Sequence, residues 1–201
     1  MTMLSAFIAY FTDLIVPPRP TERVVNALTV TELRALMRPE GLPYQDARVT
    51  ALIWELKYFG NARAAAIGAS LLREQLIELA SEDFGVPLLI PVPMHEARKR
   101  ERGHNHTELL CAALARQAGS GLHYEPRALE RTRNTPTQQG LERKARLNNV
   151  RGSMQASELV RNRVCIVVDD VSTTGATLTE AKRALREAGA RTVHTLSLAS
   201  S

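Results

Sequence analysis

The chain has 201 residues, a net charge of +5 and 44% apolar residues. This length suits one domain of ordinary size with a short extra segment, and the apolar fraction is sufficient for a buried core. Four Phe, four Tyr and one Trp are few for a protein that stacks many nucleobases on aromatic side chains, so the composition disfavours that class of nucleic-acid binder.

The two cysteines, Cys111 and Cys165, form no CxxC motif. We interpret them as small buried residues of a protein in the reducing cytoplasm, because a disulfide framework needs more and closer cysteines.

The apolar stretch at residues 1–16 is interrupted by Asp13 and is too short to span a bilayer. We predict that it is a helix packed on the protein, with membrane-surface binding as the less favoured alternative.

Three prolines between positions 17 and 20 end this first helix. We predict that residues 1–46 form an N-terminal appendage and that residues 47–201 form the main domain. From Val49 onwards, the apolar spacing predicts a short helix, a turn near Gly60 that carries Lys57, and a longer helix.

The apolar run at residues 86–93, "VPLLIPVP", predicts a buried strand that ends at the carboxyl edge of a sheet. Residues 95–119 are expected to start as a polar loop and to become a helix that stops at Gly119. A short extended piece precedes Leu129. Residues 131–153 lack apolar periodicity, and we interpret them as a long mobile loop, which at this length is usually functional or disordered.

The C-terminal part has the pattern of a βαβ unit. It consists of the apolar strand "VCIVVDDV" at 164–171, the helix "TLTEAKRALREAG" at 177–189 and the strand "RTVHTLSLA" at 191–199. Because a strand, a helix and a strand in this order form a right-handed crossover, we predict a parallel sheet.

The loop between the first strand and the helix of this unit has the composition of a phosphate site. Ligands of open parallel sheets bind beyond the carboxyl ends of the strands, where backbone N–H groups begin the next helix. Gly175 gives the loop conformational freedom, and the loop also offers several small or hydroxyl side chains. The predicted phosphate-binding residues are Ser172, Thr173, Thr174, Gly175, Ala176 and Thr177. No P-loop or dinucleotide-binding glycine pattern is present.

Asp169 and Asp170 come just before this loop, where they would repel a phosphate unless they contact another part of the same ligand. Carboxylates accept hydrogen bonds from vicinal hydroxyls and hold Mg²⁺ through water. A ribose with a 5-phosphate therefore fits both features. The structural alternative is a helix N-cap, which needs only one such residue.

The stretch "VVDDVSTTGAT" at residues 167–177 resembles the phosphoribosyl-pyrophosphate binding motif of type I phosphoribosyltransferases. This resemblance implies an α/β fold with an open, mainly parallel sheet, flanking helices and a small N-terminal helical appendage. It also implies that Asp169 and Asp170 engage the ribose hydroxyls and Mg²⁺ as the catalytic pair, while residues 172–177 hold the 5-phosphate.

Three further stretches are similar to the ComF family, which is associated with competence for DNA uptake in bacteria. They are "LIWELKYFGN", "IPVPMHEARKRERGHNHTELL" and "TPTQQGLERKARLNNVRGSM". The last one implies a flexible loop that covers the ligand and excludes water during transfer. Its matching positions include Thr135, Gln138, Arg146 and Asn149.

Basic residues are candidates for neutralising the diphosphate of such a ligand. Those after the strand at 86–93 are Arg98, Lys99, Arg100 and Arg102, and Lys57 is a further candidate. The alternative for each is a solvated side chain on a helix face or loop.

The chain departs from the ComF pattern at two places. Pro20 and Arg23 stand where the family's zinc ribbon has a CxxC pair, so we expect no zinc and an appendage held by apolar packing. His104 and His106 replace an aromatic residue and a glutamine. With His95 they suggest a metal site, but we interpret all three as ordinary surface-loop histidines.

Three functions remain open at this point. The first is a Mg²⁺-dependent phosphoribosyltransferase with an unidentified acceptor, associated with DNA uptake. The second is a non-catalytic accessory protein that binds single-stranded DNA and components of the competence machinery through its basic surface, with phosphoribosyl pyrophosphate as a regulatory ligand. The third is nucleobase salvage, which the ComF-like stretches disfavour.

Overall fold

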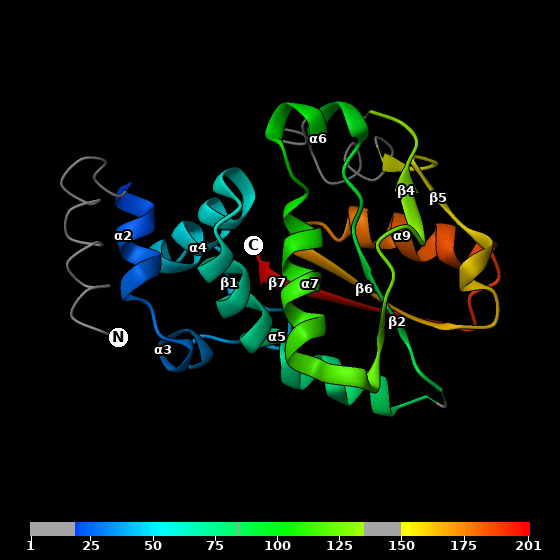
Figure 1. The fold of residues 1–201 in the computed structure, drawn as a ribbon, viewed down its shortest axis with the longest axis horizontal. Coiled ribbons are helices and arrows are strands. Elements are labelled where there is room, and N and C mark those ends of the chain that lie inside the picture. The colour runs from blue at the N-terminus through cyan, green and yellow to red at the C-terminus, as the bar shows by residue number, and fades with distance from the viewer. Residues whose placement is uncertain (1–18, 84, 135–149) are drawn as a thin grey trace.

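The computed structural model describes residues 19–83, 85–134 and 150–201, and its centre is a five-stranded sheet (Figure 1). In spatial order the strands are β1 (Leu42–Pro43), β7 (Thr192–Ser200), β6 (Val164–Ser172), β2 (Leu88–Pro91) and β3 (His123–Tyr124). All neighbouring pairs are parallel. The predicted α/β fold with a mainly parallel sheet is therefore confirmed.

The predicted βαβ unit forms the core of this sheet. The first seven residues of β6 are buried, because helices cover both faces of the sheet and leave no solvent-facing side. Helix α9 (Ala176–Glu187) follows β6 and leads back to β7, which pairs with β6 from Val164↔Thr192 to Ser172↔Ser200. Cys111 and Cys165 are free and buried, as expected.

Alternating side chains of the strands supply two separate cores. Leu89, Ile166, Val168, Leu196 and Leu198 pack with α4 (Ala47–Phe59), α5 (Ala62–Ser81) and α7 (His106–Ala118) on one face. Leu88, Ile90, Cys165, Val167 and Val193 pack with α9 on the other face. Figure 1 shows α7 and α9 on opposite sides of the strands.

A small antiparallel hairpin flanks α9. It consists of β4 (Leu129–Arg131) and β5 (Met154–Ala156), and the 3₁₀ turns Gly119–Gly121 and Glu158–Val160 lie nearby in the chain. The predicted cover residues Thr135, Gln138, Arg146 and Asn149 lie outside the described residues, as does the predicted helix at 1–16. Within the described ranges, no helix is long and apolar enough to cross a membrane.

The N-terminal segment shares the core of the main sheet. It contains α2 (Pro20–Ala27) and α3 (Val30–Arg34), and its buried residues Val25, Leu28, Leu33 and Leu42 belong to the same cluster as the residues of α4, α5 and α7. Strand β1 extends the sheet by pairing with the end of β7, Leu42↔Ala199 and Pro43↔Ser200. The predicted boundary between residues 46 and 47 stays a prediction.

A buried carboxylate adds a polar connection to this apolar packing. Glu55 on α4 is fully buried. It accepts hydrogen bonds from Arg19 (2.8 and 3.2 Å), from Thr21 (2.6 Å) and from Asn61 (3.0 Å). Burial opposes its ionisation, but these donors lower its pKa below the ordinary value. The entry to α2 is therefore tied to α4 by a charge as well as by apolar contacts.

The predicted polar loop after β2 contains a short helix, α6 (Glu96–Arg102). His95 Nδ1 accepts a hydrogen bond from the Ala97 N–H (3.2 Å), and Gly103 ends the helix at φ 83°. Since α6 buries none of its side chains, it has no apolar periodicity by which a helix is predicted. The capping residues alone indicate it.

Candidate functional site

A cavity of about 810 Å³ lies beyond the carboxyl ends of β2 and β6. Most of the predicted site residues line it: Lys57, Arg98, Arg102, Asp169, Asp170, Ser172, Thr173, Thr174, Gly175, Ala176 and Thr177. Residues that are far apart in the sequence therefore meet at the edge of the sheet where ligands of parallel sheets bind.

Two of the predicted basic residues do not line this cavity. Lys99 pairs with Glu108, with its Nζ 2.9 and 3.1 Å from the two carboxylate oxygens. Arg100 is exposed on α6. Because successive residues of a helix point in different directions, only Arg98 and Arg102 of this basic run reach the cavity.

Asp169 and Asp170 lie near the carboxyl end of strand β6, just before the loop. Asp169 is 7% exposed and Asp170 is 4% exposed. One oxygen of each carboxylate accepts a main-chain hydrogen bond: Asp169 Oδ1 from the Asp170 N–H (2.9 Å) and Asp170 Oδ1 from the Val171 N–H (2.8 Å). These bonds fix both carboxylates at the floor of the cavity.

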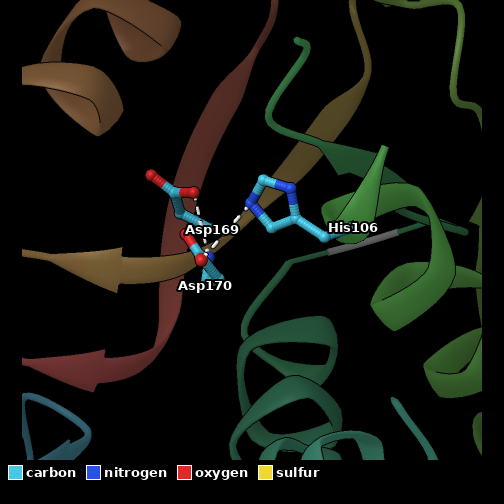
Figure 2. Close-up of side chains that lie close together, drawn as sticks. All are labelled: His106, Asp169 and Asp170. Carbon is cyan, nitrogen blue, oxygen red and sulfur yellow. Dashed lines mark hydrogen bonds and ion pairs between the residues drawn. The ribbon is translucent and has the colours of Figure 1, made fainter. Parts of the chain in front are cut away.

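Two cationic or potentially cationic side chains reach the same oxygen of Asp170. His106 Nε2 lies 3.3 Å from Asp170 Oδ2, and Lys57 Nζ lies 3.4 Å from it. Figure 2 shows the His106 ring pointing at the Asp170 carboxylate from the opposite wall. Lys57 comes from the last turn of α4, and His106 is the first residue of α7.

His106 is not a surface-loop histidine, so that interpretation is corrected. It is 7% exposed, because Asn105 caps α7 and starts the helix beside the end of β2. Strand β2 is the neighbour of β6, with Pro91 opposite Val168. The order of the strands would have indicated this contact, whereas the local sequence does not.

The two carboxylates have pKa values that shift in opposite directions. Burial, together with the charge of Asp170, raises the pKa of Asp169 to about 7. Burial acts on Asp170 as well, but His106 and Lys57 outweigh it and hold the pKa of Asp170 well below its ordinary value. Asp170 in turn raises the pKa of Lys57. Asp170 is therefore the ionised member of the pair.

The loop after β6 leads directly into α9. Gly175 precedes this helix at φ 70°, in the left-handed region, and no side chain caps the helix. Thr174 Oγ1 is 3.4 Å from the Ala176 N–H, which is at the long limit for a hydrogen bond. The first turn of α9 contains no acidic residue. The main-chain N–H groups of this first turn therefore favour the binding of an anion in the cavity.

Arg131 lines the cavity but was not among the predicted site residues. It projects from β4, and its Nε atom is buried without a hydrogen-bond partner in the described part of the chain. Burial lowers the pKa of Arg131; Asp169 opposes this effect, and the like charge of Arg98 adds to it. Two arginines that face one cavity suit a ligand with more than one negative charge.

His106, Asp169 and Asp170 could together hold a metal ion, because one ligand atom from each lies within 4.8 Å of the others. Carboxylate oxygens suit Mg²⁺, and imidazole suits borderline metals. This group of three is the candidate metal site of the described residues.

The chain is similar in sequence to a known domain family and to several known proteins. Residues 111–201 match the Phosphoribosyl transferase domain family. The DNA utilization protein YhgH of Escherichia coli O157:H7 is 35% identical over 152 residues, which cover 72% of this chain and 64% of that protein. Competence protein F of Haemophilus influenzae is 34% identical over 115 residues, which cover 55% of this chain and 49% of that protein.

Among solved structures, the adenine phosphoribosyltransferase of Thermoanaerobacter pseudethanolicus is 14% identical, with a TM-score of 0.43, and covers 86% of this chain and all of its own chain. The chain spans less than two thirds of the length of the YhgH proteins. Residues 111–201 are similar to a phosphoribosyl transferase domain, and the chain is similar to YhgH and competence protein F, which confirms the resemblance to the ComF family.

Proposed function

We propose that this protein binds phosphoribosyl pyrophosphate in the cavity at the end of β6. This proposal rests on one observation: the acid pair, the N-terminus of α9 and the arginines all line the same cavity. In this arrangement residues 172–177 hold the 5-phosphate. Asp169 and Asp170 hold the ribose hydroxyls.

The diphosphate of the ligand would lie toward the arginine side of the cavity. Arg98, Arg102 and Arg131 line that side. The buried Nε of Arg131 has no partner among the described residues, and a diphosphate oxygen would supply one. The ligand therefore satisfies a polar atom whose burial is otherwise unfavourable.

Mg²⁺ is proposed as the cofactor, and it would neutralise the diphosphate. The carboxylates of Asp169 and Asp170 are chemically suited to it, together with oxygens of the ligand. No zinc is expected at the N-terminus, where Pro20 and Arg23 replace a CxxC pair. The chain's own residues would position the ribose and bind the phosphate groups.

Transfer of the phosphoribosyl group is the reaction that this arrangement supports. The bond from the ribose C1 to a diphosphate oxygen breaks, the oxygen keeps the electron pair, and an acceptor lone pair forms the new bond to C1. The arginines stabilise the charge that develops on the departing diphosphate. The acid pair orients the sugar through its hydroxyls.

Calorimetric titration with phosphoribosyl pyrophosphate and Mg²⁺ tests the proposal. We expect saturable binding to the unmodified protein and a loss of at least about tenfold in affinity for Asp169→Asn/Asp170→Asn, since both carboxyl groups that hold the ribose hydroxyls are removed. Lys99→Met is the matched control, because Lys99 lies outside the cavity and pairs with Glu108. Absence of binding to the folded unmodified protein would refute the proposal.

Compounds that contain only one part of the ligand test where each part binds in the cavity. Arg131→Met is expected to weaken binding of inorganic diphosphate and of phosphoribosyl pyrophosphate, but to leave binding of ribose 5-phosphate unchanged. Equal weakening for all three compounds would contradict the orientation proposed here.

Binding of single-stranded DNA is a second candidate function. Three aromatic side chains of α4, Trp54, Tyr58 and Phe59, are 46%, 44% and 47% exposed. The Arg102 guanidinium lies over the Tyr58 ring at 5.0 Å, and that of Arg19 lies over Phe59 at 3.8 Å. Exposed rings beside guanidinium groups suit stacked bases and phosphates. The names of the relatives, which refer to DNA utilization and competence, agree with this function.

Fluorescence anisotropy with a labelled oligothymidine tests this second function. Trp54→Ala/Tyr58→Ala is expected to reduce affinity by about tenfold or more, as for the loss of stacking on one or two bases. Leu159→Ala is the control, because Leu159 is an exposed apolar residue at 59% on the turn Glu158–Val160. An equal affinity of the unmodified protein and the double variant would remove this surface from consideration.

A further inference from the structure

Lys57 brings a positive charge to the acid pair from outside the matched domain. It lies in the last turn of α4, whereas the Phosphoribosyl transferase domain match begins at residue 111. Its side chain is 32% exposed, and its Nζ atom is 3.4 Å from Asp170 Oδ2. The contact joins the N-terminal half of the chain to the centre of the proposed site.

Asp170 Oδ2 is in an unusual electrostatic position. It is buried and makes no hydrogen bond within the described ranges, but Lys57 Nζ and His106 Nε2 both approach it within 3.4 Å. Lys57 therefore acts on this oxygen mainly through its charge. A divalent ion on this oxygen would lie close to an ammonium group, and like charges at such a separation repel strongly in a partly buried site.

Adjacent buried carboxylates usually require a cation, and this chain already has one. We propose that Lys57 is a built-in cation of the acid pair: it neutralises Asp170 and keeps a divalent ion away from Asp169 and Asp170 until a ligand supplies further oxygens. Lys57 is then a positioning residue that acts through Asp170. The metal enters with the diphosphate and is not resident in the free protein.

Lys57 determines whether the candidate metal group can hold an ion in the free protein. His106, Asp169 and Asp170 are close enough to hold an ion, and the charge of Lys57 is what prevents it. Removing that charge while keeping the fold should therefore create a metal site, whereas a purely structural ion pair would give only a loss of stability.

Binding of Mn²⁺ to the ligand-free protein, followed by electron paramagnetic resonance, tests the proposal. We expect weak binding to the unmodified protein and binding at least about tenfold tighter for Lys57→Met, because a nearby positive charge is removed. Lys57→Arg should behave as the unmodified protein. The control Lys99→Met removes a lysine that pairs with Glu108 outside the cavity, and its Mn²⁺ affinity should not change.

The gained site is located by adding Asp170→Asn to Lys57→Met, which should remove the tight Mn²⁺ binding. Circular dichroism and a cooperative thermal transition establish that each variant is folded. If Lys57→Met is not folded, Lys57→Gln takes its place. Tight Mn²⁺ binding to the unmodified protein at this site, or no gain in the folded Lys57 variants, would overturn the proposal.

A second measurement rests on the proposed function. Binding of phosphoribosyl pyrophosphate to Lys57→Met should depend more steeply on Mg²⁺ concentration than binding to the unmodified protein. Because the Mn²⁺ measurement uses no ligand, the two hypotheses can fail separately. If Mn²⁺ binds as expected and phosphoribosyl pyrophosphate binds neither protein, the proposed function fails and the role of Lys57 stands.

Discussion

At the scale of single residues, Asp169 and Asp170 are neighbours with different chemistry. Lys57 and His106 hold Asp170 as an anion, whereas burial raises the pKa of Asp169 to about 7. At neutral pH the pair therefore contains one acceptor-only carboxylate and one that exchanges a proton. Such a pair can both accept from and donate to the hydroxyl groups of a ribose.

The raised pKa of Asp169 predicts how stability depends on pH. The folded protein keeps the Asp169 proton up to about pH 7, while the unfolded chain loses it near about pH 4. The folded state binds more protons in this window, so the free energy of unfolding falls as pH rises through it. We expect Asp169→Asn to be roughly 1–3 kcal/mol more stable than the unmodified protein at pH 8 and to lack this decline.

Urea unfolding between pH 5 and pH 8, in the presence of a chelator, measures this effect. Asp46→Asn is the control, because Arg48 lowers the pKa of Asp46 to about 2, so this variant should be less stable than the unmodified protein by the same amount at every pH in this range. Parallel stability curves for the unmodified protein and Asp169→Asn would show that the assignment to Asp169 is incorrect.

At the scale of elements, one buried carboxylate adds polar contacts to the apolar packing of helix α2. Glu55→Gln keeps the shape of the side chain but removes the negative charge that accepts hydrogen bonds from Arg19 and Thr21. We expect it to lower the free energy of unfolding by about 1–3 kcal/mol and to increase hydrogen exchange in α2. Glu22→Gln is the matched control, since Glu22 also contacts Arg19 (3.2 Å) but is partly exposed, and it should change stability by less than about 0.5 kcal/mol. Equal effects of the two substitutions would contradict this role of Glu55.

The junction of β1 and β7 depends on Gly41. Its φ is +113°, and a Cβ atom there would lie 3.0 Å from the carbonyl oxygen of Ser197 on β7. Since a main-chain atom cannot move aside, we expect Gly41→Ala to destabilise the protein by about 2–4 kcal/mol in urea unfolding. Gly103→Ala has a positive φ of +83° in the left-handed region but open space around it, so it should cost only about 1–2 kcal/mol. Equal costs would mean that the close approach of the strands is unimportant.

At the scale of the whole molecule, the site requires both halves of the chain. The family match covers residues 111–201, which include the acid pair and Arg131 but exclude Lys57 and His106. Strand β2, which lies beside β6, and the helices α4 and α5 are also outside the match. The matched segment therefore contains the recognisable motif without the neighbours that complete its surroundings.

A fragment of residues 111–201 should consequently not fold. It would expose the faces of β6 and β7 that α5 covers and the edge of β6 that pairs with β2 in the whole protein. We expect no cooperative thermal transition by circular dichroism, and no binding of phosphoribosyl pyrophosphate. The same measurements on the complete chain serve as the control, and a cooperative transition of the fragment would disprove this expectation.

The sequence predicts those parts of the site that are contiguous. The acid pair, the phosphate loop and the βαβ unit lie within about forty residues and follow one hydrophobic pattern. His106 and Arg131 could not be predicted in the same way, because their positions depend on β2 lying beside β6 and on the hairpin of β4 and β5. Helix α6 was missed because it buries no side chain.

The position of β7 has a consequence for the synthesis of the chain. β7 is the last strand, but it lies between β1 and β6 in the sheet. Until Thr192–Ser200 leave the ribosome, β1 has no neighbour and β6 has one open, apolar edge, and open strand edges favour association with other chains. The nascent protein therefore exposes this edge of β6 until β7 is made, so its yield in cells should depend on chaperones that cover the edge.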